Sequence, residues 1–273
     1  VGRNANRIGG AVIEINGTEY HLTKNDGENN LHSGLDFYHG RLWKVADADD
    51  THVTFEMDSP DGDQGYPGAL VMKVTYSLDE ENTLMIHYEA EPDQDTIINM
   101  TNHSYFNLNG HKSGDVLNHT LWLNADAFTP ADAASIPTGE IRSVEGTPMD
   151  FRIDKTIGKD IEADYEPLVF GKGYDHNWVL KNEGEFDKVA EVAGDESGIH
   201  MSVLTDLPGV QIYTANFLDG VKGRDGAVYE MRDAICLETQ YYPDAIHHEN
   251  FPGPICKKGE KYDTRTAYRF RVK

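Results

Sequence analysis

Long hydrophobic runs, cysteine and positive charge are all scarce in this sequence, and each shortage excludes a class of protein. No apolar stretch approaches the ~20 residues of a membrane-spanning helix, so no membrane partner is expected. Two cysteines, Cys236 and Cys256, are too few for a disulfide framework and favour reduced thiols in a cytoplasmic protein. Only 24 Lys and Arg residues oppose 47 Asp and Glu residues, which gives a formal net charge of −23. Because this charge repels phosphates, nucleic acid is not expected as a partner.

Helical periodicity and the common cofactor motifs are missing as well. No segment keeps apolar residues at positions i, i+3, i+4 and i+7 over several turns, and only residues 155–161 are expected to form a turn or short helix. The sequence has no phosphate-binding glycine loop, no dinucleotide fingerprint and no serine nucleophile elbow. Its 12 His residues fall in no metal-binding motif. We therefore expect no metal and no cofactor.

What the sequence does contain is a succession of short alternating segments separated by turns. Residues 11–15 and 18–22 flank Asn16-Gly17, a pair that accepts the positive φ angles of a type I′ hairpin turn. Further strands are expected over residues 51–57, 69–78, 83–90, 97–107, 120–123, 189–192, 200–204, 210–215, 234–239 and 266–272. Many short strands without long helices predict a single all-β domain, a sandwich or a barrel, over residues 1–273.

Two histidines occur in contexts that suit catalysis. His32 lies in the loop-like segment Asn30-Leu31-His32-Ser33-Gly34, and loops on a rigid scaffold often present catalytic groups. His103 lies in a polar cluster that interrupts a strand-like run, where an imidazole could transfer a proton near neutral pH. The alternatives are a surface histidine in a turn for His32 and a hydrogen-bonded core histidine for His103.

Three further polar residues stand among apolar or aromatic neighbours. Asp175 is followed by His176-Asn177-Trp178, and a carboxylate beside aromatic rings suits a sugar, although it could equally cap a turn. Glu238 interrupts a short apolar strand, which is unfavourable unless the carboxylate is paired or functional. Gln211 interrupts another strand. A solvent-facing position in an alternating strand is the other interpretation of both.

Together these segments resemble the aldose 1-epimerase (galactose mutarotase) family. The resemblance extends along nearly the whole chain, and its order is more specific than any one motif. Its eight anchors are residues 2–8, 30–34, 65–68, 101–108, 174–177, 208–214, 216–220 and 237–240.

The resemblance implies a large antiparallel β-sandwich, the galactose mutarotase-like supersandwich, with few short helices. It implies a cofactor-independent isomerase that interconverts the α and β anomers of free aldohexoses such as galactose or glucose. By matching positions, Glu238 corresponds to the catalytic base, His103 to the acid and His32 to a second active-site histidine. The positions that match sugar-binding residues are Asn6, Arg7, Asp175 and Gln211.

Two departures from the family pattern stand out. Family chains usually have several strands ahead of the segment at residues 2–8, where this sequence starts, so one edge of the expected sandwich would be uncovered. Ser33 occupies a position where Gly is common, and because serine is also small, little effect is expected.

Two other functions remain open at this point. Asp175 and Glu238 could be the paired carboxylates of a glycoside hydrolase, which requires them about 5–9.5 Å apart. The chain could instead be a non-catalytic carbohydrate-binding sandwich. The sequence does not distinguish galactose from glucose, and it leaves the oligomeric state undetermined.

Overall fold

The computed structural model describes all residues from Val1 to Lys273 and divides them between two compact units. The first unit comprises residues 1–102 and 240–267, and the second comprises residues 103–239 and 268–273. Strands dominate both, and the only α-helix is six residues long. This confirms the predicted all-β class with few short helices. None of the helices has the length and apolar character that crossing a bilayer demands.

The elements of the first unit are β1 (Arg7–Ile8), η1 (Gly9–Ala11), β2 (Val12–Ile15), β3 (Thr18–His21), β4 (Asn30–Leu31), η2 (Tyr38–Gly40), β5 (Lys44–Ala48), β6 (His52–Ser59), η3 (Asp63–Gly65), β7 (Leu70–Leu78), β8 (Thr83–Pro92), β9 (Thr96–Ile97), η6 (Ala245–His247) and β21 (Ile255–Cys256). Here η denotes a short 3₁₀ helix. The last long strand, β22 (Tyr262–Val272), begins in this unit and ends in the second.

The elements of the second unit are β10 (Thr120–Leu123), β11 (Ala125–Thr129), β12 (Arg142–Ser143), β13 (Lys155–Thr156), η4 (Ile157–Lys159), α1 (Glu166–Gly171), β14 (Asp175–Leu180), β15 (Asp187–Ala193), β16 (Ile199–Thr205), β17 (Gly209–Tyr213), β18 (Val221–Lys222), η5 (Arg224–Gly226), β19 (Val228–Tyr229) and β20 (Cys236–Gln240). The final residue of β20 is assigned to the first unit.

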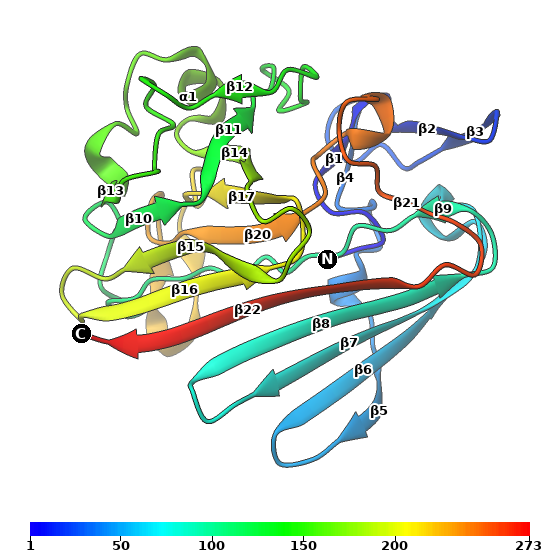
Figure 1. The fold of residues 1–273 in the computed structure, drawn as a ribbon, viewed down its shortest axis with the longest axis horizontal. Helices are drawn as coiled ribbons and strands as arrows, with labels where there is room; N and C mark the ends of the chain where they lie inside the picture. Colours follow the sequence, from blue (N-terminus) through cyan, green and yellow to red (C-terminus); the bar gives the residue numbers. More distant parts are fainter. The chain divides into compact units, whose positions relative to one another are not determined.

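In the first unit, β5, β6, β7 and β8 form an antiparallel meander in chain order (Figure 1). Strand β7 pairs along its whole length, with Leu70 opposite Ser59 of β6 and opposite Pro92 of β8. Its residues alternate in burial, since Met72 is fully buried whereas Val71 is exposed. This period of two places one apolar face of the meander against the core.

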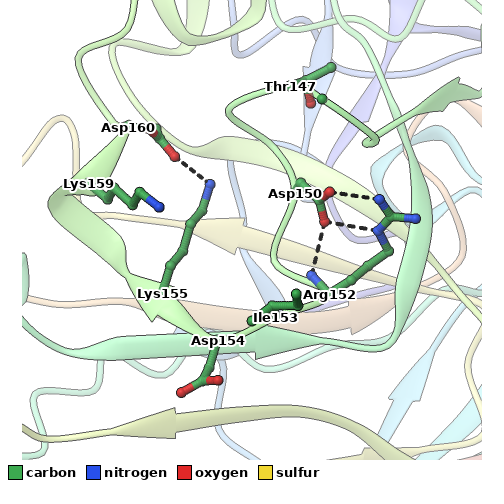
Figure 2. Close-up of a pocket in the computed structure, with 9 residues that line it drawn as sticks. Thr147, Asp150, Arg152, Ile153, Asp154, Lys155, Lys159 and Asp160 are labelled. Atoms are coloured by element: carbon green, nitrogen blue, oxygen red, sulfur yellow. Dashed lines mark hydrogen bonds and ion pairs between the residues drawn. The ribbon is translucent and has the colours of Figure 1, made fainter.

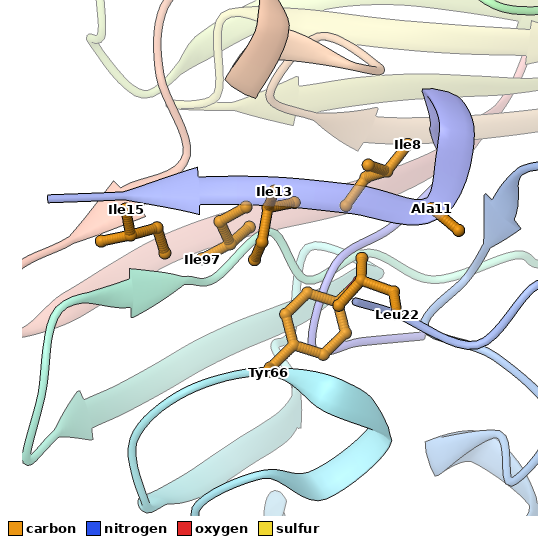
Figure 3. Packing of buried hydrophobic residues seen from close by; sticks show 7 residues of the cluster. All are labelled: Ile8, Ala11, Ile13, Ile15, Leu22, Tyr66 and Ile97. Carbon is orange, nitrogen blue, oxygen red and sulfur yellow. The ribbon is translucent and has the colours of Figure 1, made fainter. Parts of the chain in front are cut away.

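A compact hydrophobic core fixes the N-terminal hairpin of the first unit (Figure 3). Ile13 and Ile15 point from one face of β2, while the intervening Glu14 is exposed. Burial of each isoleucine contributes roughly 1.5–3 kcal/mol. The seven residues of the cluster are Ile8, Ala11, Ile13, Ile15, Leu22, Tyr66 and Ile97. The hairpin turn has φ angles of 53° at Asn16 and 75° at Gly17, as a type I′ turn requires.

In the second unit, a five-stranded sheet has the order β12-β11-β14-β17-β20 (Figure 1). The pairing of β14 with β17 is antiparallel, with Asp175 opposite Tyr213 and Asn177 opposite Gln211. Neighbouring strands of this sheet therefore carry Asp175, Gln211 and Glu238, three of the polar residues that the sequence singles out. A second group of strands in this unit has the order β13-β10-β15-β16.

The strand predicted over residues 97–107 is wrong for most of its length. Only Ile97 belongs to a strand, β9, and two isolated bridges, at Asn99 and Phe106, follow it. The physical reason is that asparagine side chains here bond to the main chain and compete with regular pairing. The Asn99 side chain bonds to both main-chain groups of Tyr241, and Asn107 Nδ2 donates to the carbonyl of Gly114 at 2.7 Å.

Candidate functional site

Glu238 is a buried carboxylate in the middle of β20. All five residues of this strand are buried, and Glu238 is 2% exposed. A side-chain hydrogen bond fixes the backbone of this strand, since the hydroxyl of Tyr268 donates to the Leu237 carbonyl at 2.9 Å. Glu238 Oε1 lies 3.6 Å from Nε2 of His103. The second unit thus places a carboxylate and an imidazole, far apart in sequence, where both can exchange protons with one ligand.

Two tyrosines enclose the His103 ring. Tyr105 stacks on it, with ring centroids 5.0 Å apart and an angle of 20° between the planes. Tyr213 meets it edge-on, at 5.8 Å and 81°. These contacts restrict how the imidazole can turn. Tyr213 also lies opposite Asp175 in the sheet, so it links the His103 region to the next pair of polar residues.

Burial keeps two phenols and a thiol near Glu238 neutral. It raises the pKa of Tyr213 to about 12 and that of Tyr105 further, with smaller contributions from repulsion by Asp175 and Glu238. Burial also raises the pKa of the Cys236 thiol well above its usual value. At neutral pH neither the phenols nor the thiol is charged, so none of them offers a ready anionic base or a thiolate.

Asp175 and Gln211 form a second polar pair on neighbouring strands. Gln211 Nε2 donates to Asp175 Oδ1 at 2.7 Å. Gln211 is buried, whereas Asp175 is half-buried. The amide orients the carboxylate, and the two side chains together offer acceptors and a donor. This combination suits a ligand rich in hydroxyl groups.

His176, next to Asp175, is a buried histidine with a role that the sequence did not reveal. Its Nδ1 accepts a hydrogen bond from the backbone N–H of Asp175 at 3.1 Å, and its ring also bonds to the backbone of Pro167. Burial lowers the pKa of His176 to about 4. A neutral imidazole therefore holds the backbone that carries Asp175. The only sequence signal was its position next to Asp175, in a segment where no strand was predicted and which forms β14.

The remaining predicted residues lie together in the first unit. Strands β1 and β4 pair with Arg7 opposite Leu31, which brings Asn6 next to His32. The Asn6 backbone N–H donates to His32 Nδ1 at 3.0 Å, and the His32 N–H donates to the Asn6 carbonyl at 3.0 Å. A neutral His32 therefore carries its proton on Nε2. Arg7 Nε donates to Asp26 Oδ2 at 2.7 Å.

A cluster of possible metal ligands in the first unit already holds a positive charge. His87 Nε2 lies 2.7 Å from Asp263 Oδ1, and Glu89 is also near. The ammonium of Lys261 lies 2.6 Å from Glu89 and 3.0 Å from Asp263. The carboxylates of this cluster are therefore neutralised by a side chain of the protein.

A pocket of about 520 Å³ opens in the second unit, and none of the predicted residues lines it (Figure 2). Two of its three cations pair with carboxylates of the same pocket, and the third is Lys159. Arg152 forms a two-pronged bond with Asp150, and Lys155 Nζ lies 2.7 Å from Asp160. Lys155 also covers the ring of Phe151. Because these cations have carboxylate partners, the pocket gives no specific indication of an anionic ligand.

Comparison with known proteins adds independent findings. The family model described as aldose 1-epimerase matches residues 1–269. Galactose mutarotase of Bos taurus is 43% identical over 273 residues, with 100% of this chain and 78% of the relative covered. Galactose mutarotase of Homo sapiens is 42% identical with the same coverage, and aldose 1-epimerase of Escherichia coli is 38% identical, covering 99% of this chain and 78% of the relative.

Solved structures give the same result for the fold. The aldose epimerase homologue of C. elegans has a TM-score of 0.91 at 32% identity, covering 100% of this chain and 81% of that one. Galactose 1-epimerase of Lactobacillus acidophilus has a TM-score of 0.87 at 28% identity, covering 100% and 79%. These matches confirm the fold class that the resemblance implied. On the family model and on relatives about 40% identical over their matched length, the chain belongs to the aldose 1-epimerase family.

Proposed function

We propose that this protein interconverts the α and β anomers of free aldohexoses such as galactose, as the names of its relatives indicate for them. The observation that carries the proposal is the Glu238–His103 pair, 3.6 Å apart. Mutarotation needs one base and one acid in reach of the same sugar, and no redox step.

The proposed mechanism uses two proton transfers in each direction. Glu238, ionised at rest, removes the proton from the anomeric hydroxyl, while protonated His103 donates a proton to the ring oxygen. The bond between C1 and the ring oxygen breaks to give the open aldehyde. Rotation about C1–C2 and closure from the other face invert the anomeric centre, and each proton returns to its origin. Positioned acid–base catalysis of this kind contributes roughly 10²–10⁴-fold.

The other predicted residues keep supporting roles in the proposal. Asp175 and Gln211 bind sugar hydroxyls, which agrees with their hydrogen-bonded arrangement. From the family resemblance, Asn6 and Arg7 also bind sugar hydroxyls, and His32 is the second active-site histidine. Arg7 in addition stabilises the negative charge that develops on the sugar oxygen. The proposed reaction has a free sugar as its substrate, and it requires no cofactor and no nucleic-acid or membrane partner. Two free buried thiols, Cys236 and Cys256, support a reducing compartment such as the cytoplasm.

A neutral sugar fits the charge pattern better than a sugar phosphate. A phosphate would need cations that lack protein partners. Three cations of the first unit have carboxylate partners instead: Arg7 pairs with Asp26, Arg41 with Asp63, and Lys44 with Asp58.

Polarimetry tests the proposal directly. Freshly dissolved α-D-galactose and α-D-glucose should lose their excess rotation faster with the protein than without it. Glu238→Gln should remove most of this acceleration while sugar still binds, because an amide cannot take up the proton. Glu249→Gln, which changes an exposed glutamate, is the matched control and should keep full activity. Near-normal activity in Glu238→Gln would show that Glu238 is not the base.

The two alternative functions give different results in simple assays. A glycoside hydrolase would release the chromophore from a nitrophenyl glycoside, whereas a mutarotase acts only on free reducing sugars. A carbohydrate-binding module would bind galactose without changing the rate of mutarotation, and His103→Ala would leave its affinity intact.

A further inference from the structure

Arg232 is a buried cation in the second unit whose hydrogen bonds go to neutral oxygen atoms. It is 8% exposed and lies between β19 and β20. Its guanidinium donates to Thr214 Oγ1 at 3.2 Å, to Asn216 Oδ1, and to the carbonyl of Lys172 at 2.5 Å. Burial lowers the pKa of Arg232. Burying a charge without a contacting carboxylate is unfavourable, and here the hydrogen bonds and the attraction of Glu162 offset that cost.

The oxygen atoms around Arg232 belong to a network that holds the turn before Asp175. Asn216 Nδ2 donates to the carbonyl of Gly171 at 2.7 Å and to that of Tyr174 at 3.0 Å. The Tyr174 carbonyl also accepts from the backbone N–H of Thr214 at 3.0 Å. With the bond from Arg232 to Lys172, three carbonyls of the four-residue turn 171–174 are fixed by this network. The next residue along the chain is Asp175.

The backbone is shaped to admit the guanidinium. A Cβ atom on Gly173 would lie 2.5 Å from Arg232 Nη1, and Gly173 has a φ of 128°, so only glycine fits there. On the other side, Ala215 and Arg232 both have positive φ angles, 52° and 76°, and the Arg232 N–H bonds to the Ala215 carbonyl at 3.4 Å. Residues other than glycine adopt a positive φ angle only when the surrounding structure imposes it. Such backbone strain concentrates at functional sites.

We propose that Arg232 is a positioning residue for sugar recognition, which acts by fixing the turn 171–174 and thereby the carboxylate of Asp175. The inference rests on the proposed function, in which Asp175 binds a sugar hydroxyl. Arg232 itself does not touch the sugar in this proposal, and it has no part in the proton transfers of Glu238 and His103. Loss of Arg232 therefore weakens sugar binding and leaves the chemical step largely intact.

The test is a double-mutant cycle of Arg232→Gln with Asp175→Asn, measured by polarimetry over a range of galactose concentrations and pH values. In the parent protein, Arg232→Gln should raise KM by about tenfold, the equivalent of one charged hydrogen bond, with kcat and the pH profile nearly unchanged. In the Asp175→Asn background the same change should have little further effect on KM. Arg224→Gln, an exposed arginine in η5, is the matched control and should change neither constant.

Two further variants keep the inference testable if Arg232→Gln does not fold. Arg232→Lys keeps the charge but loses the fork of donors, and should give a smaller rise in KM. Asn216→Asp keeps an acceptor for Arg232 but loses the donors to Gly171 and Tyr174, and should raise KM as Arg232→Gln does. Unchanged KM in these folded variants would overturn the inference, and so would an equal rise in KM in both backgrounds. If Asp175→Asn alone leaves KM unchanged, the assigned role of Asp175 fails instead.

Discussion

The buried neutral imidazole of His176 predicts that the second unit loses stability in mild acid. Its pKa is lowered to about 4 in the folded protein, whereas an unfolded chain has the ordinary value of about 6.5. The unfolded state therefore binds more protons between pH 4 and 6.5. By linkage, the stability that His176 contributes is complete above pH 6.5 and is lost as the pH falls toward 4.

The size of the effect follows from the two pKa values. At pH 5 the unfolded imidazole is almost fully protonated and the folded one almost fully neutral, and pH 5 lies about 1.5 units below the unfolded pKa. At ~1.36 kcal/mol per unit, the free energy of unfolding should be about 2 kcal/mol lower at pH 5 than at pH 7 on account of His176. Other groups titrate over the same range, so a variant is needed to isolate this contribution.

His176→Asn is the variant, because its side-chain oxygen can accept the Asp175 N–H bond without titrating. Urea unfolding followed by tryptophan fluorescence would be measured at pH 7, 6 and 5, since Trp178 is fully buried beside the imidazole. The variant should be less stable than the parent at pH 7, owing to lost ring packing. This difference should shrink by about 2 kcal/mol between pH 7 and pH 5. A difference that stays constant with pH would refute the argument.

Two further predictions concern packing and the setting of the acid. Ile13→Ala should lower the free energy of unfolding of the first unit by about 2–5 kcal/mol in urea denaturation, because it leaves a cavity. The control Leu42→Ala, at a 98% exposed position, should change this free energy by less than about 0.5 kcal/mol. Tyr105→Ala should lower kcat by about 2–10-fold through loss of the stacked ring, and Tyr105→Phe should not. Equal losses in the two Tyr105 variants would instead implicate the hydroxyl.

Local pattern was enough to predict most of the strands and the class of the fold. The hairpin at Asn16-Gly17 is confirmed because both residues accept positive φ angles. Strand β10 was predicted with the bounds that the structure has. Failures occurred where side chains bond to the main chain, as at residues 98–107, and in helix α1, which is too short to show a period. Strands β5, β11 and β14 were also not predicted. The prediction of a single domain over residues 1–273 remains a prediction.

The candidate site, like the fold, could be predicted only in part from local sequence pattern. An acidic residue inside an apolar strand identified Glu238 as unusual, and the structure confirms its burial there. Local pattern could not show that His103, 135 positions earlier, lies beside it, because that proximity depends on tertiary structure. Only the family resemblance implied a shared site. The network around Arg232 was equally hidden, since a loop arginine gives no local sign of being buried. The catalytic and binding roles of the seven predicted residues remain predictions.

The register of β14 has a consequence for how the family can vary by insertion and deletion. Asp175 and His176 are neighbours on one strand, so their side chains point to opposite faces, one toward the polar pair and the other into the aromatic core. A shift of β14 by one residue against β17 would exchange the two, placing a carboxylate in the core and an imidazole beside Gln211. Natural variants should therefore change in length at hairpin tips such as residues 194–198, between β15 and β16, and keep the spacing from Gly171 to Asp175.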